Sequence, residues 1–299
     1  MTLRIEPHFH QPTSTATFLV WDEATAEAAV IDPVLDYDAR GSRISTESAD
    51  SLLASIKRQG LTLKLILETH AHADHLTSAR YLRARTGAKV VIGEKIGAVQ
   101  AHFAPMFDAT DVVPDGRAFD HLAADGEILP LGSLQIRVMH TPGHTAACVS
   151  YLIEDAAFVG DTLFMPDYGT ARTDFPGGDA AALYRSIRRL LDLPPQTRLF
   201  VGHDYLPAGR STFAWETTVA EQRTANVQIH DGIAEADFVA QRRARDSTLA
   251  PPALLLPSLQ VNIRAGALPP PDRSGRVFLR LPVTGAPDMS EPRQPEMAL

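Results

Sequence analysis

The sequence contains a single cysteine among its 299 residues. One cysteine cannot form an intramolecular disulfide, a thiolate zinc site or an iron–sulfur cluster. The disulfide-rich secreted class is therefore excluded, and any metal must be bound by other side chains. Because free thiols are typical of the cytoplasm, we expect a cytoplasmic protein.

Basic charge and long apolar runs are also scarce. The 28 Lys and Arg residues are outnumbered by 36 Asp and Glu residues, giving a net charge of −8 and no positive field to attract nucleic acid. No run of about 18 apolar residues indicates a transmembrane helix, and the first residues do not resemble a signal peptide. We expect neither nucleic acid nor a membrane as a partner, whereas the sequence leaves open whether the chain forms a homo-oligomer.

Short apolar runs alternate with helical patterns along the first two thirds of the chain, which predicts a layered α/β fold. The predicted strands are 17–21, 28–31, 61–67, 89–92, 134–139, 148–153, 157–159 and 198–201. The predicted helices are 47–59, 77–85, 95–100, 180–191, 214–227 and 235–245. Asp179 is a favourable N-cap for the fourth helix, and Gly87 a favourable end for the second.

The last third of the chain is rich in proline. We expect a catalytic domain over 1–245 and a Pro-rich extension over 246–299 that packs on it and has a mobile end. The apolar stretch 253–263 within this extension could also form an interface between copies of the chain.

Potential metal ligands follow the predicted strand 61–67 almost at once. His70, His72, Asp74 and His75 lie within six residues of one another. Imidazole and carboxylate are the groups that bind divalent metals without thiolate, and a loop at the end of a rigid strand is where binding sites usually lie.

Three further strands are each followed by a side chain of the same kind. HTPGHT brings His144 after one strand, FVGDT brings Asp161 after another, and LFVGHDY brings His203 after a third. Four strand ends that each deliver a metal-binding side chain predict a buried metal site in an α/β sandwich.

The order HxHxDH, HTPGHT, GD and GHD resembles the metallo-β-lactamase superfamily over roughly residues 15 to 205. This resemblance implies an αβ/βα sandwich with a metal site along one edge of its paired sheets. The segment RTDF, followed by Gly177, Gly178 and a helix, resembles the persulfide dioxygenase branch, the group of the human ethylmalonic encephalopathy protein.

The resemblance to this branch implies one Fe(II) per chain, held by His70, His144 and Asp161. Such a facial triad leaves positions open for substrate and dioxygen. The implied reaction converts glutathione persulfide, O₂ and water into sulfite and glutathione. Four more residues would then act in catalysis by orienting ligands or water: His72, Asp74, His75 and His203.

The same residues could instead hold two metal ions. By resemblance to the hydrolases of the superfamily, His70, His72 and His144 would bind one ion and Asp74, His75 and His203 the other, with Asp161 bridging them. The alternative function is therefore a glyoxalase II-like hydrolase of glutathione thioesters, in which a dinuclear site supplies hydroxide. A metal-dependent or degenerate binding module is the non-enzymatic alternative.

Two residues are candidates for binding the substrate. Arg172 could hold a carboxylate of glutathione, although a structural ion pair with Asp174 would equally explain it. Tyr205 resembles a glutathione-contacting position of the thioesterase relatives. Cys148 is interpreted as a small buried hydrophobic residue rather than a persulfide carrier.

Overall fold

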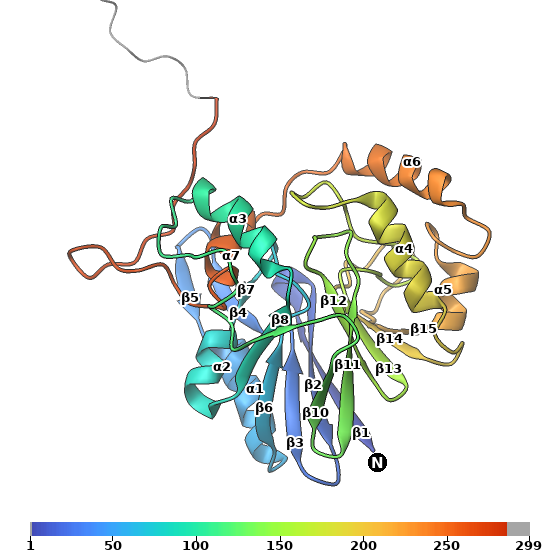
Figure 1. The fold of residues 1–299 in the computed structure, drawn as a ribbon, viewed down its shortest axis with the longest axis horizontal. Coiled ribbons are helices and arrows are strands. Elements are labelled where there is room, and N and C mark those ends of the chain that lie inside the picture. Colours follow the sequence, from blue (N-terminus) through green and yellow to red (C-terminus); the bar gives the residue numbers. More distant parts are fainter. Residues whose placement is uncertain (1, 286–299) are drawn as a thin grey trace, which may run out of the picture.

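The computed structural model describes residues 2–285, so the mobile end predicted for the C-terminal extension lies outside the described residues. Two six-stranded sheets face each other, with helices on their outer sides (Figure 1). The first sheet has the order β1 (Leu3–His10), β2 (Thr15–Asp22), β3 (Glu27–Ile31), β6 (Thr62–Leu67), β8 (Lys89–Gly93) and β9 (His121–Ala123). The second has the order β10 (Ile128–Leu131), β11 (Leu134–His140), β12 (Val149–Ile153), β13 (Ala156–Gly160), β14 (Arg198–Val201) and β15 (Glu216–Thr218).

The helices divide between the two sheets. Beside the first sheet lie α1 (Glu47–Arg58), α2 (Ala79–Thr86) and α3 (Ile96–Met106), and beside the second lie α4 (Ala180–Leu191), α5 (Val219–Ala225) and α6 (Glu235–Asp246) (Figure 1). A small third sheet joins β5 (Arg43–Ser45), β4 (Val34–Asp38) and β7 (Leu76–Thr77). The predicted αβ/βα sandwich is therefore confirmed.

The core follows the two-residue period of the strands. In β3, Ala29 and Ile31 pack between the sheets, whereas Ala28 and Val30 pack against the helices. The second sheet repeats this division, with Phe158 facing the other sheet and Val159 facing the outer helices. Strands covered on both faces explain why these segments appear in the sequence as almost continuous apolar runs.

Most predicted elements are confirmed, and so are two predicted helix ends. The Asp179 side chain accepts a hydrogen bond from the Ala182 amide at 2.6 Å, and Gly87 ends α2 with a φ of 75°. The helix predicted over 214–227 is wrong at its start, because residues 216–218 pair with β14 as strand β15. The helix begins only after Thr218, whose hydroxyl accepts from the Glu221 amide in a capping box.

The apolar stretch 253–263 forms the helix α7 (Leu255–Asn262). Its side chains Leu259 and Ile263 pack within this chain, in the core that α1 to α3 share with the first sheet. The domain boundary at 245 stays a prediction. Among the described residues, no helix is both long and apolar enough to cross a membrane.

Candidate metal centre

The candidate ligands lie at one edge of the sandwich, where strands of both sheets end. The loop 68–75 follows β6, His144 lies between β11 and β12, and Asp161 and His203 follow β13 and β14. A hydrogen bond from the Val149 amide to the Thr69 carbonyl at 2.9 Å links the two sheets at this edge. Gly160 allows the close approach, since its φ is +50° and a Cβ there would lie 2.4 Å from Thr69 Oγ1.

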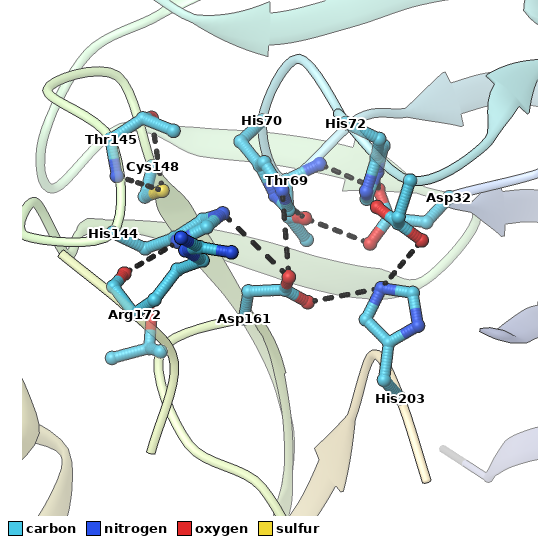
Figure 2. A network of polar contacts seen from close by, with 12 residues as sticks. Asp32, Thr69, His70, His72, His144, Thr145, Cys148, Asp161, Arg172 and His203 are labelled. Carbon is cyan, nitrogen blue, oxygen red and sulfur yellow. Dashed lines mark hydrogen bonds and ion pairs between the residues drawn. The ribbon is translucent and has the colours of Figure 1, made fainter. Parts of the chain in front are cut away.

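Three residues form the first group of potential ligands: His70, His144 and Asp161. One ligand atom from each lies within 4.8 Å of the others. Asp161 Oδ2 lies 3.9 Å from His70 Nε2 and 3.7 Å from His144 Nε2. Figure 2 shows the Asp161 carboxylate between these two imidazoles and His203.

Hydrogen bonds fix the orientation of both imidazoles in this group. His144 Nδ1 donates to the Arg172 carbonyl at 2.8 Å, and His70 Nδ1 lies 3.0 Å from Thr69 Oγ1 (Figure 2). A donor at Nδ1 leaves the lone pair on Nε2, the atom that faces Asp161. Within residues 2–285, His70 Nε2 and Asp161 Oδ1 are buried without a hydrogen-bond partner, so the group fits a divalent metal ion.

The direction in which the pKa of His70 is shifted agrees with metal binding by this group. Burial, reinforced by the neighbouring imidazoles of His72 and His144, holds the pKa of His70 well below its ordinary value. A neutral imidazole is the form that binds a metal. Burial raises the pKa of the Asp161 carboxyl, and a bound cation would oppose that effect.

A second group of potential ligands lies beside the first and contains His72, Asp74, His75 and His203. His203 Nε2 lies 3.3 Å from Asp74 Oδ2 and 3.3 Å from Asp161 Oδ1. Although burial opposes the charged form of His203, Asp161 and Asp74 raise its pKa overall. The pKa of Asp74 is held well below its ordinary value by His203 and His75, against the effect of burial. This group could hold a second cation or exchange protons.

His72 also belongs to a buried cluster that sequence reasoning missed, with Asp32 and Glu68. Its Nε2 atom lies 3.0 Å from Asp32 Oδ1 and 3.7 Å from Glu68 Oε2. Asp32 also accepts hydrogen bonds from the Thr69 amide at 2.7 Å and the Thr69 hydroxyl at 2.8 Å. The signal was present, because Asp32 follows the predicted strand 28–31 just as the other ligands follow theirs.

A pocket of about 190 Å³ opens onto His144 and Asp161. Both predicted substrate-binding residues line it. The Arg172 guanidinium is held by Asp174 at 2.6 and 2.7 Å and donates to the Ala250 carbonyl at 2.7 Å. Tyr205 stacks on His203, with ring centroids 5.6 Å apart and an interplanar angle of 12°. The structural ion pair weighed for Arg172 is therefore present, in a residue that also faces the pocket.

Several lining residues were not singled out from the sequence, among them Tyr168, Arg242 and Arg245. Arg242 is buried and paired with Asp246 at 2.6 Å. Arg245 is exposed above the Tyr168 ring and, within the described residues, has no ion-pair partner. The pattern predicted the helix that carries the two arginines, but helical periodicity does not indicate which arginines face a site formed by other elements.

Comparisons with known proteins agree with this fold. The chain is 50% identical over 292 residues to a probable metallo-hydrolase of Burkholderia pseudomallei, covering 94% of this chain and 99% of that protein. It is 46% identical to glyoxylase B2 of Dictyostelium discoideum, covering 94% and 97%. It is 48% identical to a beta-lactamase hydrolase-like protein of Xylella fastidiosa, covering 94% of this chain but only 65% of that longer protein.

Similarity extends to persulfide dioxygenases. The human mitochondrial persulfide dioxygenase ETHE1 is 32% identical over 225 residues, covering 74% of each chain. The crystal structure of ETHE1 from Myxococcus xanthus is 32% identical with a TM-score of 0.71, covering 89% of this chain and 100% of that one. Residues 10–203 match the family described as the metallo-beta-lactamase superfamily. The chain therefore belongs to the metallo-beta-lactamase superfamily, with homologues in its persulfide dioxygenase branch.

Proposed function

We propose that the protein is an iron-dependent persulfide dioxygenase that oxidises glutathione persulfide with O₂ to sulfite and glutathione. The observation that carries the proposal is the composition of the first ligand group, two histidines and one aspartate. Two histidines and one carboxylate are the ligand set of non-haem iron oxygenases.

His70, His144 and Asp161 would hold the iron, one ion per chain. Iron(II) bound there would supply one-electron chemistry with dioxygen, which amino-acid side chains cannot supply. The chain's own contribution is orientation. Thr69 and the Arg172 carbonyl fix the two imidazoles through Nδ1. The segment that contains Arg172 also lines the substrate pocket.

The pocket provides groups suited to a peptide-like anion. Arg172 and Arg245 offer guanidinium donors for carboxylates, and Phe164, Tyr168 and Tyr205 form an aromatic wall. His203 lies beside the other carboxylate oxygen of Asp161 from His144, where it would accept protons released during turnover. Glutathione persulfide, O₂ and water give glutathione, the sulfite dianion and two protons.

A second candidate is a glyoxalase II-like hydrolase of glutathione thioesters. The observation that favours it is the second ligand group, because His72, Asp74, His75 and His203 also lie within 4.8 Å of one another. The similarity to glyoxylase B2 of Dictyostelium discoideum agrees with this candidate. Two metal ions would supply a hydroxide at neutral pH.

One preparation tests both candidates. The protein is purified without oxygen and its metal content is measured. Samples as purified and samples loaded with Fe(II) are then assayed for oxygen uptake with glutathione persulfide and for hydrolysis of S-lactoylglutathione. The proposal expects about one iron per chain and iron-dependent oxygen uptake with sulfite as a product. Two zinc ions per chain, thioester hydrolysis and no iron-dependent oxygen uptake would overturn it in favour of the hydrolase.

A further inference from the structure

A chain of side chains leads from the second ligand group to a pocket that the catalytic site does not use. Thr15 Oγ1 lies 3.4 Å from His75 Nδ1 and 3.4 Å from His203 Nδ1. The Thr15 hydroxyl lies 2.7 Å from the Thr13 hydroxyl, and Thr13 Oγ1 lies 2.7 Å from His10 Nδ1. The path therefore joins two buried imidazoles to a third imidazole through two hydroxyls.

The far end of this path reaches solvent. His10 Nε2 lies 3.3 Å from Asp36 Oδ1, and His10 and Asp36 line a pocket of about 330 Å³ with His8, Glu47 and Ser48. This pocket shares no lining residue with the pocket over His144 and Asp161. The path thus leads from the second ligand group to a separate opening of the molecule across a fully buried threonine, Thr15.

The turn between β1 and β2 places these groups together. His10 ends β1, Thr13 lies in the short 3₁₀ turn Gln11–Thr13, and Thr15 begins β2, where it pairs directly with His10. Ser14 takes a φ of 55°, and its carbonyl accepts from the Asp204 amide at 3.0 Å. The turn is therefore fixed against the segment that carries His203.

We propose that His10, Thr13 and Thr15 form a proton path between the catalytic site and this second pocket. The proposal rests on turnover at the proposed site, where persulfide oxidation and thioester hydrolysis alike release protons. A substrate bound in the first pocket would cover His144 and Asp161 on that side, and the path would give protons a second way out. Hydroxyls both donate and accept, and an imidazole takes up a proton at one nitrogen and releases one at the other.

Turnover of four variants tests the path. His10→Ala and Thr13→Val are expected to lower kcat at least about tenfold at unchanged KM. Added imidazole is expected to restore turnover in His10→Ala, because the small base can enter the second pocket, and not in Thr13→Val. Thr13→Ser keeps the hydroxyl and is expected to behave as wild type. His8→Ala is the matched control, since His8 lines the same pocket but pairs with Glu6 at 3.1 Å, off the path.

A second measurement does not depend on activity. In protein labelled with ¹⁵N-histidine, Zn(II) added to the metal-free protein is expected to shift the ring resonances of His10 in the wild type and in Thr13→Ser. In Thr13→Val the His10 resonances should stay in place. The path is refuted if the His10 resonances of the wild type do not respond to zinc. It is also refuted if His10→Ala and Thr13→Val keep full turnover. If neither glutathione substrate is turned over, the proposed function fails and the zinc response alone decides on the path.

Discussion

Asp161 Oδ1 lies 3.3 Å from His203 Nε2, while its second oxygen faces His70 and His144. One carboxylate thus separates the two groups of potential ligands (Figure 2). In the proposed dioxygenase this carboxylate would bind one metal ion. In the alternative hydrolase it would bridge two.

Substitution of the histidines on either side of Asp161 is expected to have different effects on bound metal. His144→Ala removes a ligand of the proposed iron centre, so iron per chain should fall severalfold or more, together with activity. His203→Ala should retain about one iron per chain and lose turnover by roughly a hundredfold. Metal analysis of both variants beside the wild type provides the check. If the wild type held two metal ions and both variants lost the same amount of metal, a mononuclear centre would be contradicted.

Arg245 is expected to bind a carboxylate of the substrate. A charge-assisted hydrogen bond contributes about 1.5–3 kcal/mol, so Arg245→Ala should raise KM for the glutathione substrate roughly tenfold or more at unchanged kcat. Arg243, an exposed neighbour on α6 that does not line the pocket, is the matched control. Steady-state kinetics of Arg245→Ala, Arg245→Lys and Arg243→Ala make the comparison. An equal KM in all three would show that Arg245 does not contact the substrate.

Asn262 is expected to stabilise the loop that carries His72 and His75. Its Nδ2 atom donates to the carbonyls of both residues at 2.8 Å, and its Oδ1 atom accepts from the Thr77 amide at 2.9 Å. Asn262→Ala leaves these buried groups unpaired, so the free energy of unfolding should fall by about 3 kcal/mol.

The control for Asn262 lies on the same helix. Gln260→Ala removes partly buried hydrogen bonds to Leu256 and Arg280, away from the loop. Urea unfolding and metal titration of both variants separate the effects, because only Asn262→Ala should weaken metal binding. Unchanged metal affinity in Asn262→Ala would show that the loop keeps its shape without this side chain.

Cys148 is expected to make the stability of the protein fall at alkaline pH. Burial raises the pKa of its thiol from 9.0 to about 12. Between these values the unfolded thiol loses its proton while the folded thiol keeps it, so rising pH favours the unfolded state by up to about 1.4 kcal/mol per pH unit. Below pH 9 this contribution is fully present as stability.

Urea unfolding of the wild type and Cys148→Ser at pH 8, 9 and 10 measures this effect. The difference in unfolding free energy between the two proteins should be constant up to about pH 9 and then shift against the wild type. Cys148→Ser should also keep full turnover, since a neutral buried thiol is a poor nucleophile. Loss of turnover in Cys148→Ser with intact folding and metal content would instead support a persulfide carrier.

The repeated pattern of a strand followed by a potential metal ligand can be recognised in the sequence, because the strand and the ligand are close together along the chain. A strand buried on both faces is a short apolar run, and the residue after it begins the loop. That pattern predicted the sandwich and placed His70, Asp161 and His203 at strand ends. Asp32 also follows a predicted strand. It was not predicted as a site residue because no histidine lies beside it in the sequence.

Other features depend on contacts between distant segments. Nothing local to Asn262 predicts that its amide binds a loop 187 residues earlier, and the periodicity of α6 does not reveal that Arg245 faces the pocket. The strand β15 was predicted as helix because pairing with β14 supplies its backbone hydrogen bonds, a partner invisible in a local window.

By itself, the sequence determined the supply of ligands and their positions along the chain: histidines and carboxylates without thiolates, each next to a buried strand. Only the tertiary structure decided how they are grouped. It turned His72 toward Asp32, separated two ligand groups across Asp161, and brought His10, Thr13 and Thr15 into line with His203. The physical reason is that side-chain orientation at a buried site is set by packing and by the pairing of every buried polar group, which involve residues far apart in the sequence.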